Sequence, residues 1–137
     1  MLKTPCIHPD LMGLLAACGH GDKVLIADGN YPLATHTGEA TNKVYLGLTH
    51  GIPLVTQVLG VLGKTVSIEN AEVMVPESGE TPEIFSEFIA LLPKDISLSK
   101  LQRFEFYEAC KTDSVKIAIS TGEQRVYANL LITIGVA

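Results

Sequence analysis

A short buried strand with a polar loop at each end is the feature that most constrains the fold of this chain. Residues 24–27 form an apolar run with two β-branched side chains, a pattern typical of a strand buried inside a sheet. His20 and Asp22 precede this run, and Asp28 and Asn30 follow it. Because glycines in both loops let a molecule approach the backbone closely, the segment predicts a site for a small polar ligand.

Helical and strand-like patterns alternate along the rest of the chain. Apolar residues recur at helical spacing in residues 9–18, 54–62, 82–92 and 101–110. Strand patterns are present in residues 24–27, 44–48, 66–68, 71–75, 116–120 and 126–136. This order predicts a single α/β domain over residues 1–137, with a mixed, largely parallel sheet flanked by helices.

The composition narrows the class of protein further. Hydrophobic residues make up 47% of the 137 residues and charged residues 18%, so the chain is more apolar and less charged than an average soluble domain. We expect part of this apolar surface to be buried between subunits, in a homo-oligomer. The net charge of -5 argues against a nucleic-acid partner, because proteins that bind nucleic acids present basic patches.

The cysteines and the missing motifs exclude several further classes. Cys6, Cys18 and Cys110 are odd in number and lack the spacing of metal ligands. No signal-peptide pattern opens the chain and no apolar run is long enough to cross a membrane, so we expect a reduced cytoplasmic protein. Motifs for nucleotides, zinc and an activated serine are missing, so no cofactor and no metal are expected.

The remaining chemistry is acid–base catalysis by histidine, aspartate and tyrosine on an uncharged polar substrate. His20 follows a predicted helix end, where it acts either as a general acid or base or only as a helix cap, and spacing alone favours the cap. Arg103 and Tyr107 share one side of a predicted helix, which is either a packing helix or the wall of a site. Tyr127 and Asn129 lie two apart on a predicted strand and therefore face the same side.

Two other polar residues have less specific patterns. His36 lies in a loop without periodicity, and we interpret it as a solvated residue. Gln57 lies within an apolar helix, where an exposed position and a hydrogen bond across a subunit contact are equally consistent with the pattern.

Three longer motifs stand out along the chain: Leu-Ala-Ala-Cys-Gly-His-Gly-Asp at 15–22, Ile-Ala-Asp-Gly-Asn-Tyr-Pro at 26–32 and Thr-Gly-Glu-Gln-Arg-Val-Tyr-Ala-Asn-Leu-Leu at 121–131. Together they resemble the RbsD/FucU family of D-ribose pyranases and L-fucose mutarotases. Residues 48–61 resemble the ribose branch, whereas Arg-Phe-Glu-Phe-Tyr-Glu at 103–108 resembles the fucose branch. No single motif is specific, but their order and spacing cover nearly the whole chain.

The resemblance implies a role for each matching residue. The candidate catalytic residues are His20, the proton donor that the resemblance implies, and Tyr107 or Tyr127, which we hypothesise as a second proton-transfer group. The resemblance implies the sugar-binding residues Asp28, Arg103, Tyr127, Ala128 and Asn129. We further hypothesise that Asp22 or Asp28 orients His20 or binds sugar hydroxyls. The arginine at position 103 favours the fucose-type pocket, because ribose-type members place a histidine in this region and this chain has no histidine after position 50.

The implied activity is mutarotation of a free monosaccharide, L-fucose or a similar sugar. A base and an acid open the hemiacetal ring, and reclosure exchanges the anomers without a metal or cofactor. The resemblance also implies a ring-shaped homo-oligomer, an octamer or a decamer, with sites near the subunit contacts. Three alternatives stay open: a D-ribose pyranase, a non-catalytic monosaccharide-binding module, and a structural oligomer whose polar residues only cap helices and strands.

Overall fold

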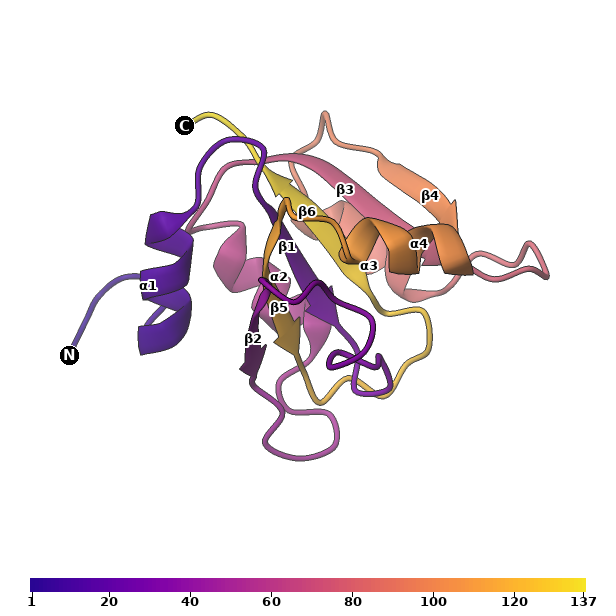
Figure 1. The fold of residues 1–137 in the computed structure, drawn as a ribbon, viewed down its shortest axis with the longest axis horizontal. Helices are drawn as coiled ribbons and strands as arrows, with labels where there is room; N and C mark the ends of the chain where they lie inside the picture. The colour runs from indigo at the N-terminus through magenta and orange to yellow at the C-terminus, as the bar shows by residue number, and fades with distance from the viewer.

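The chain folds into one six-stranded sheet with helices on both faces (Figure 1). A computed structural model describes all of residues 1–137. The strands are β1 (Lys23–Ala27), β2 (Asn42–Tyr45), β3 (Ile68–Val75), β4 (Leu98–Gln102), β5 (Val115–Ser120) and β6 (Leu130–Ile134). The helices are α1 (Pro9–Ala17), α2 (Val55–Leu62), α3 (Ile84–Leu91) and α4 (Arg103–Cys110). The strand order is β2-β5-β1-β6-β3-β4, and only β6 runs antiparallel to its neighbours. The predicted α/β class with a largely parallel sheet is therefore confirmed.

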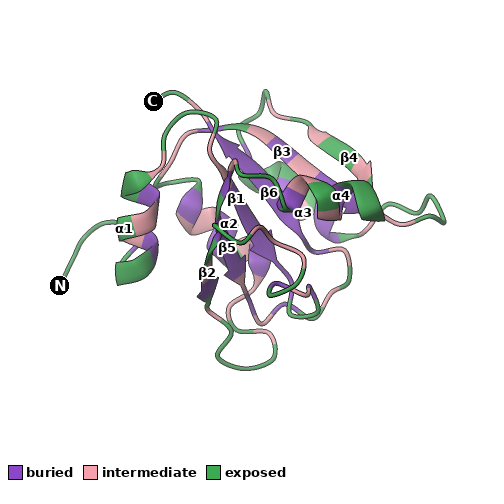
Figure 2. Cartoon of the chain, in the orientation of Figure 1, coloured by how far each residue is buried: buried purple, intermediate pink, exposed green.

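Strand β1 lies inside the sheet, and side chains on its two faces enter two separate cores. Val24 and Ile26 pack with residues of α1, α2 and α3, whereas Leu25 and Ala27 pack with residues of α4. All four residues are fully buried, which explains the continuous apolar run in the sequence. Figure 2 shows the same layering, with buried strands at the centre and exposed outer faces on α1 and α4.

The boundaries of several elements differ from the sequence prediction. Residues 66–68 and 71–75, predicted as two strands, contribute to the single strand β3. Residues 98–102, predicted as a connector and the start of a helix, form the edge strand β4. The predicted terminal strand 126–136 was too long, because β6 spans only Leu130–Ile134. The polar segment ahead of β6 is instead a turn.

Side-chain caps fix the start of two helices. The backbone N–H of Leu54 donates to Gln57 Oε1 at 2.8 Å, so Gln57 caps the first turn of α2. The backbone N–H of Gln102 donates to Glu105 Oε1 at 3.1 Å at the start of α4. Because β4 ends at Gln102 and α4 begins at the next residue, Arg103 lies at the carboxyl edge of the sheet.

The carboxyl ends of the parallel strands meet the amino end of β6 at this edge. Asp28 follows β1, Arg103 follows β4 and Asn129 precedes β6. In α/β sheets this edge is the usual place for a ligand. None of the helices is both long and apolar enough to cross a lipid bilayer.

Candidate active site

A cavity of about 200 Å³ lies at the carboxyl edge of the sheet. Five of the candidate catalytic and sugar-binding residues line it, together with Asn30 of the polar loop: Asp28, Arg103, Tyr107, Tyr127 and Asn129. Cavities of about 510 and 680 Å³ adjoin it, the first through Asn30 and the second through Val126 and Tyr127. We place the candidate site in the smaller cavity, because a buried carboxylate, a guanidinium group and tyrosines converge there.

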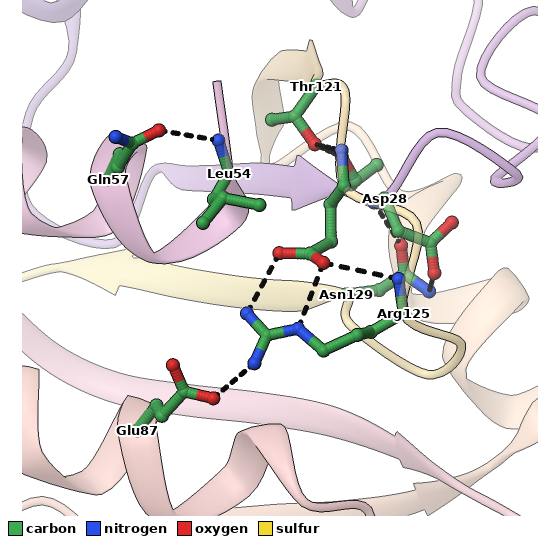
Figure 3. Close-up of polar contacts among 9 residues, drawn as sticks. Asp28, Leu54, Gln57, Glu87, Thr121, Arg125 and Asn129 are labelled. Carbon is green, nitrogen blue, oxygen red and sulfur yellow. Dashed lines mark hydrogen bonds and ion pairs between the residues drawn. The ribbon is translucent and has the colours of Figure 1, made fainter. Parts of the chain in front are cut away.

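Asp28 is held rigidly at the wall of this cavity. Its side chain is buried, and Oδ1 accepts hydrogen bonds from the backbone N–H groups of Asn30 and Tyr31, each at 2.9 Å. Oδ2 accepts from Asn129 Nδ2 at 3.1 Å, and the backbone N–H of Asp28 donates to Asn129 Oδ1 at 2.8 Å (Figure 3). Burial raises the pKa of the Asp28 carboxyl above its usual value, although these hydrogen bonds oppose the shift. A buried acid with a raised pKa is suited to proton exchange.

Aromatic rings and an arginine form another part of the cavity wall. The Tyr107 ring lies 5.6 Å from the ring of Tyr31 and 4.3 Å from the ring of His36, measured between centroids. The guanidinium carbon of Arg103 lies 5.8 Å from the centre of the Tyr107 ring. Arg103 forms none of the ion pairs of the chain, so its donors are free for a ligand. His36, interpreted from sequence as a solvated loop residue, instead packs against the aromatic wall.

Tyr127 lies in the turn that precedes β6 and has a left-handed backbone, with φ of 57°. The prediction that Tyr127 and Asn129 share a strand face is wrong, because β6 starts at Leu130. Both side chains nevertheless line the cavity, and the turn rather than a strand brings them there. Ala128 between them is fully buried, and its backbone hydrogen bond helps to stabilise the Asp28 carboxylate.

His20 and Asp22 lie at the other end of β1. His20 Nε2 is 2.9 and 3.0 Å from the two carboxylate oxygens of Glu69, and its side chain is 59% exposed. Asp22 Oδ2 accepts a hydrogen bond from the backbone N–H of Gly19 at 2.8 Å. Five residues of β1, about 16 Å at the usual rise, separate this end from Asp28. A single copy of the chain therefore does not bring His20 to the cavity.

Sequence reasoning missed three residues of the cavity wall: Tyr31 after β1, Met74 of β3 and Val126 of the turn. Tyr31 lies within the motif at residues 26–32, which could have pointed to it. Met74 reads as one apolar residue among several in its strand, and Val126 carries no distinguishing pattern. Only the contact between β3, α4 and the turn reveals their position. No three metal-ligating side chains lie together anywhere in the chain.

Comparisons with known proteins identify the same family as the sequence motifs. The chain matches the RbsD / FucU transport protein family over residues 1–137. It is 35% identical over 141 residues to the fucose mutarotase of Homo sapiens, covering 95% of this chain and 89% of the relative. It is 29% identical over 143 residues to a D-ribose pyranase of Vibrio vulnificus strain YJ016, covering 99% of both.

A solved structure gives the same result for the fold. The structure of Bacillus subtilis RbsD complexed with D-ribose superposes with a TM-score of 0.85 at 27% identity, covering 100% of this chain and 99% of the other. The match of the whole chain in sequence and in fold means that this protein belongs to the RbsD/FucU family, whose curated members include sugar pyranases and mutarotases.

Proposed function

We propose that the chain interconverts the anomers of a free monosaccharide, L-fucose or a similar sugar. The observation that carries this proposal is the convergence of a buried carboxylate, a free guanidinium group and two tyrosines on one small cavity, at Asp28, Arg103, Tyr107 and Tyr127. The membership of the family and the likeness to the human fucose mutarotase support the same class of reaction.

The reaction needs one group that accepts a proton and one that donates a proton. A base removes the proton of the anomeric hydroxyl, the bond between C1 and the ring oxygen breaks, and an acid protonates that ring oxygen. Rotation about the C1–C2 bond turns the other face of the aldehyde toward the hydroxyl. Attack of the hydroxyl on that face closes the ring to the other anomer. Asp28 is preorganised to bind or deprotonate a hydroxyl, and Tyr107 or Tyr127 can relay a proton. Such a positioned acid or base contributes roughly 10²- to 10⁴-fold.

Arg103 supports a fucose-type pocket. Its planar fork can bind two sugar oxygens at once, and no carboxylate of the chain competes for it. By resemblance, ribose-type members place a histidine in this region, and this chain has none after His50. The second candidate is a D-ribose pyranase, which recloses the ring through a different hydroxyl. The ribose-like segment 48–61 and the pyranase relatives favour this alternative.

His20 joins this reaction only if a second copy of the chain supplies it. Because β1 holds His20 and Asp28 at opposite ends, we propose that neighbouring subunits of a ring share each site. Exposed apolar side chains support such a contact, among them Leu48 at 82% and the neighbouring Ile52 at 52% exposure. Ile52 also lines an apolar cavity of about 410 Å³ between α2 and the N-terminal segment.

Saturation-transfer NMR on the anomeric protons tests the activity directly. We expect catalytic amounts of protein to accelerate the exchange of L-fucose anomers, and Asp28→Asn to abolish the acceleration. Selective pyranose–furanose exchange of D-ribose would assign the chain to the pyranase alternative. Line broadening without faster exchange of any sugar would show that the protein binds the sugar without catalysis. That result would overturn the proposal.

A mixing experiment tests the shared site. His20→Ala and Asp28→Asn each inactivate every site in their own homo-oligomer. Co-expressed in equal amounts, they leave about a quarter of the shared sites with both native residues, because each residue comes from a different subunit. Recovery of about a quarter of the wild-type rate supports the shared site, whereas a mixture as inactive as the single variants contradicts it. A fully active His20→Ala protein removes His20 from the mechanism.

A further inference from the structure

An ion pair between a buried carboxylate and a partly exposed arginine lies in the segment that carries Tyr127 and Asn129. This segment, residues 121–129, links β5 to β6 and contains no regular secondary structure. Glu123, with a side chain only 2% exposed, faces Arg125 within it. Glu123 Oε1 accepts from Arg125 Nε at 3.0 Å and Oε2 accepts from Arg125 Nη2 at 3.1 Å. This bidentate pairing fixes the direction of both side chains.

The pair is anchored to a neighbouring helix as well. Arg125 Nη1 donates to the carboxylate of Glu87 on α3, so one guanidinium group bridges two carboxylates (Figure 3). Burial alone raises the pKa of the Glu123 carboxyl, but the hydrogen bonds from Arg125 outweigh burial and the pKa lies below its usual value. Glu123 therefore keeps its charge at neutral pH, and the link between the segment and α3 persists.

The backbone of Glu123 reaches the other half of the candidate site. The N–H of Gly29, next to Asp28, donates to the carbonyl oxygen of Glu123 at 2.8 Å. The N–H of Glu123 donates to Thr121 Oγ1 at 3.2 Å, and this hydroxyl donates to the carbonyl oxygen of Ala27 at 2.7 Å. Glu123 thus joins the loop after β1 to the turn before β6.

We propose that the Glu123–Arg125 pair positions Tyr127 and Asn129 and so sets sugar affinity and turnover without touching the sugar, and that the half-exposed contact with Glu87 adds little to this role. Neither Glu123 nor Arg125 lines the candidate cavity. Only one residue separates Arg125 from Tyr127, whose left-handed backbone requires outside support. The inference rests on the proposed function of the cavity.

Arg125→Lys is the sharpest variant, because it keeps the positive charge next to Glu123 but removes the planar fork. A misplaced contact group costs about 10²-fold, so we expect kcat/KM for anomer exchange to fall by about 10- to 100-fold, with a raised KM and a lowered kcat. Glu87→Gln is the matched control. It removes only the half-exposed partner and keeps the Glu123–Arg125 pair, and we expect less than about threefold change. The double variant Glu123→Gln/Arg125→Met, which leaves no unpaired buried charge, replaces the lysine variant if that variant does not fold.

Amide hydrogen exchange gives a second readout that does not depend on activity. The N–H of Asp28 is bonded to Asn129 Oδ1, so its protection reports whether Asn129 stays in place. We expect its exchange to accelerate by about tenfold or more in Arg125→Lys and to stay unchanged in Glu87→Gln. A folded Arg125→Lys protein with native KM, kcat and Asp28 protection overturns the inference, even if its melting temperature drops, since the pair is then only structural. If the wild-type protein accelerates no sugar exchange, the proposed function fails, and Asp28 protection alone decides the positioning role.

Discussion

The buried carboxyl of Asp28 makes the stability of the chain depend on pH in a defined direction. Its pKa in the folded protein lies above the ordinary value of 3.8, so the folded state binds this proton more tightly than the unfolded chain. The contribution of Asp28 to the free energy of unfolding is therefore fully present below that value and falls as pH rises through the folded pKa. Asp28→Asn removes this dependence, and it leaves Asn129 Nδ2 facing another amide at a cost of about 1 kcal/mol.

Urea unfolding of the wild type and of Asp28→Asn, from about pH 3.5 to about pH 7, measures this effect. We expect the deficit of the variant to shrink as pH rises and then to stay constant. A deficit that is the same at every pH contradicts a raised pKa for Asp28.

At Tyr127, the proposed function needs an aromatic side chain, whereas the left-handed backbone favours glycine. A left-handed backbone costs a residue with a Cβ roughly 1–2 kcal/mol, and glycine avoids this cost. Tyr127→Gly and Tyr127→Ala both remove the ring and should both abolish anomer exchange. Thermal unfolding should show the glycine variant to be the more stable of the two, in spite of the flexibility of glycine in the unfolded chain. An alanine variant as stable as the glycine variant argues against strain at this turn.

The turn at residues 49–52 leaves no room for a side chain at Gly122, after β5. A Cβ there would lie 2.3 Å from the carbonyl oxygen of Thr49 and 2.7 Å from the backbone nitrogen of Ile52. We expect Gly122→Ala to lower the free energy of unfolding by about 1–3 kcal/mol or more. Gly13, exposed in α1 with nothing within 4 Å, is the control, and Gly13→Ala should raise it by about 0.5–1 kcal/mol. Chemical denaturation of both proteins checks the opposite signs, and equal effects refute the packing argument.

The predictability of each element follows its burial. The strand β1 is buried on both faces, so it has a continuous apolar run that is recognisable in the sequence. The edge strand β4 contains Lys100 and Gln102, and its two leucines are only partly buried, so no strand pattern was visible. The turn with Tyr127 precedes a long apolar run, so the sequence pattern predicts a strand there. Its left-handed residue depends on contacts with distant segments, which local periodicity does not report.

At the scale of the whole molecule, the family motifs identify candidate site residues in the sequence. Only the fold shows which of these residues lie together in space. The Asp28 side of the site is brought together by β1, α4 and the turn before β6, three segments far apart in the sequence. His20 belongs to the same motif region, yet the rigid length of β1 keeps it away from Asp28. The distance follows from the sheet, whereas the sequence shows only that the two residues are close along the chain.

If the proposed shared site is correct, this separation makes the activity depend on assembly. If neighbouring subunits share each site through the apolar surface near Leu48 and Ile52, a charge on that surface should separate the subunits and stop anomer exchange together. Leu48 is 82% exposed in the single chain, so Leu48→Glu should leave its fold intact. Ile89→Glu, at a 56% exposed position on α3 outside this surface, is the control and should change neither property. Light scattering after gel filtration gives the mass, and circular dichroism checks the fold. A Leu48→Glu protein of reduced mass with undiminished activity would show that one subunit suffices, and His20 would then act only as the partner of Glu69.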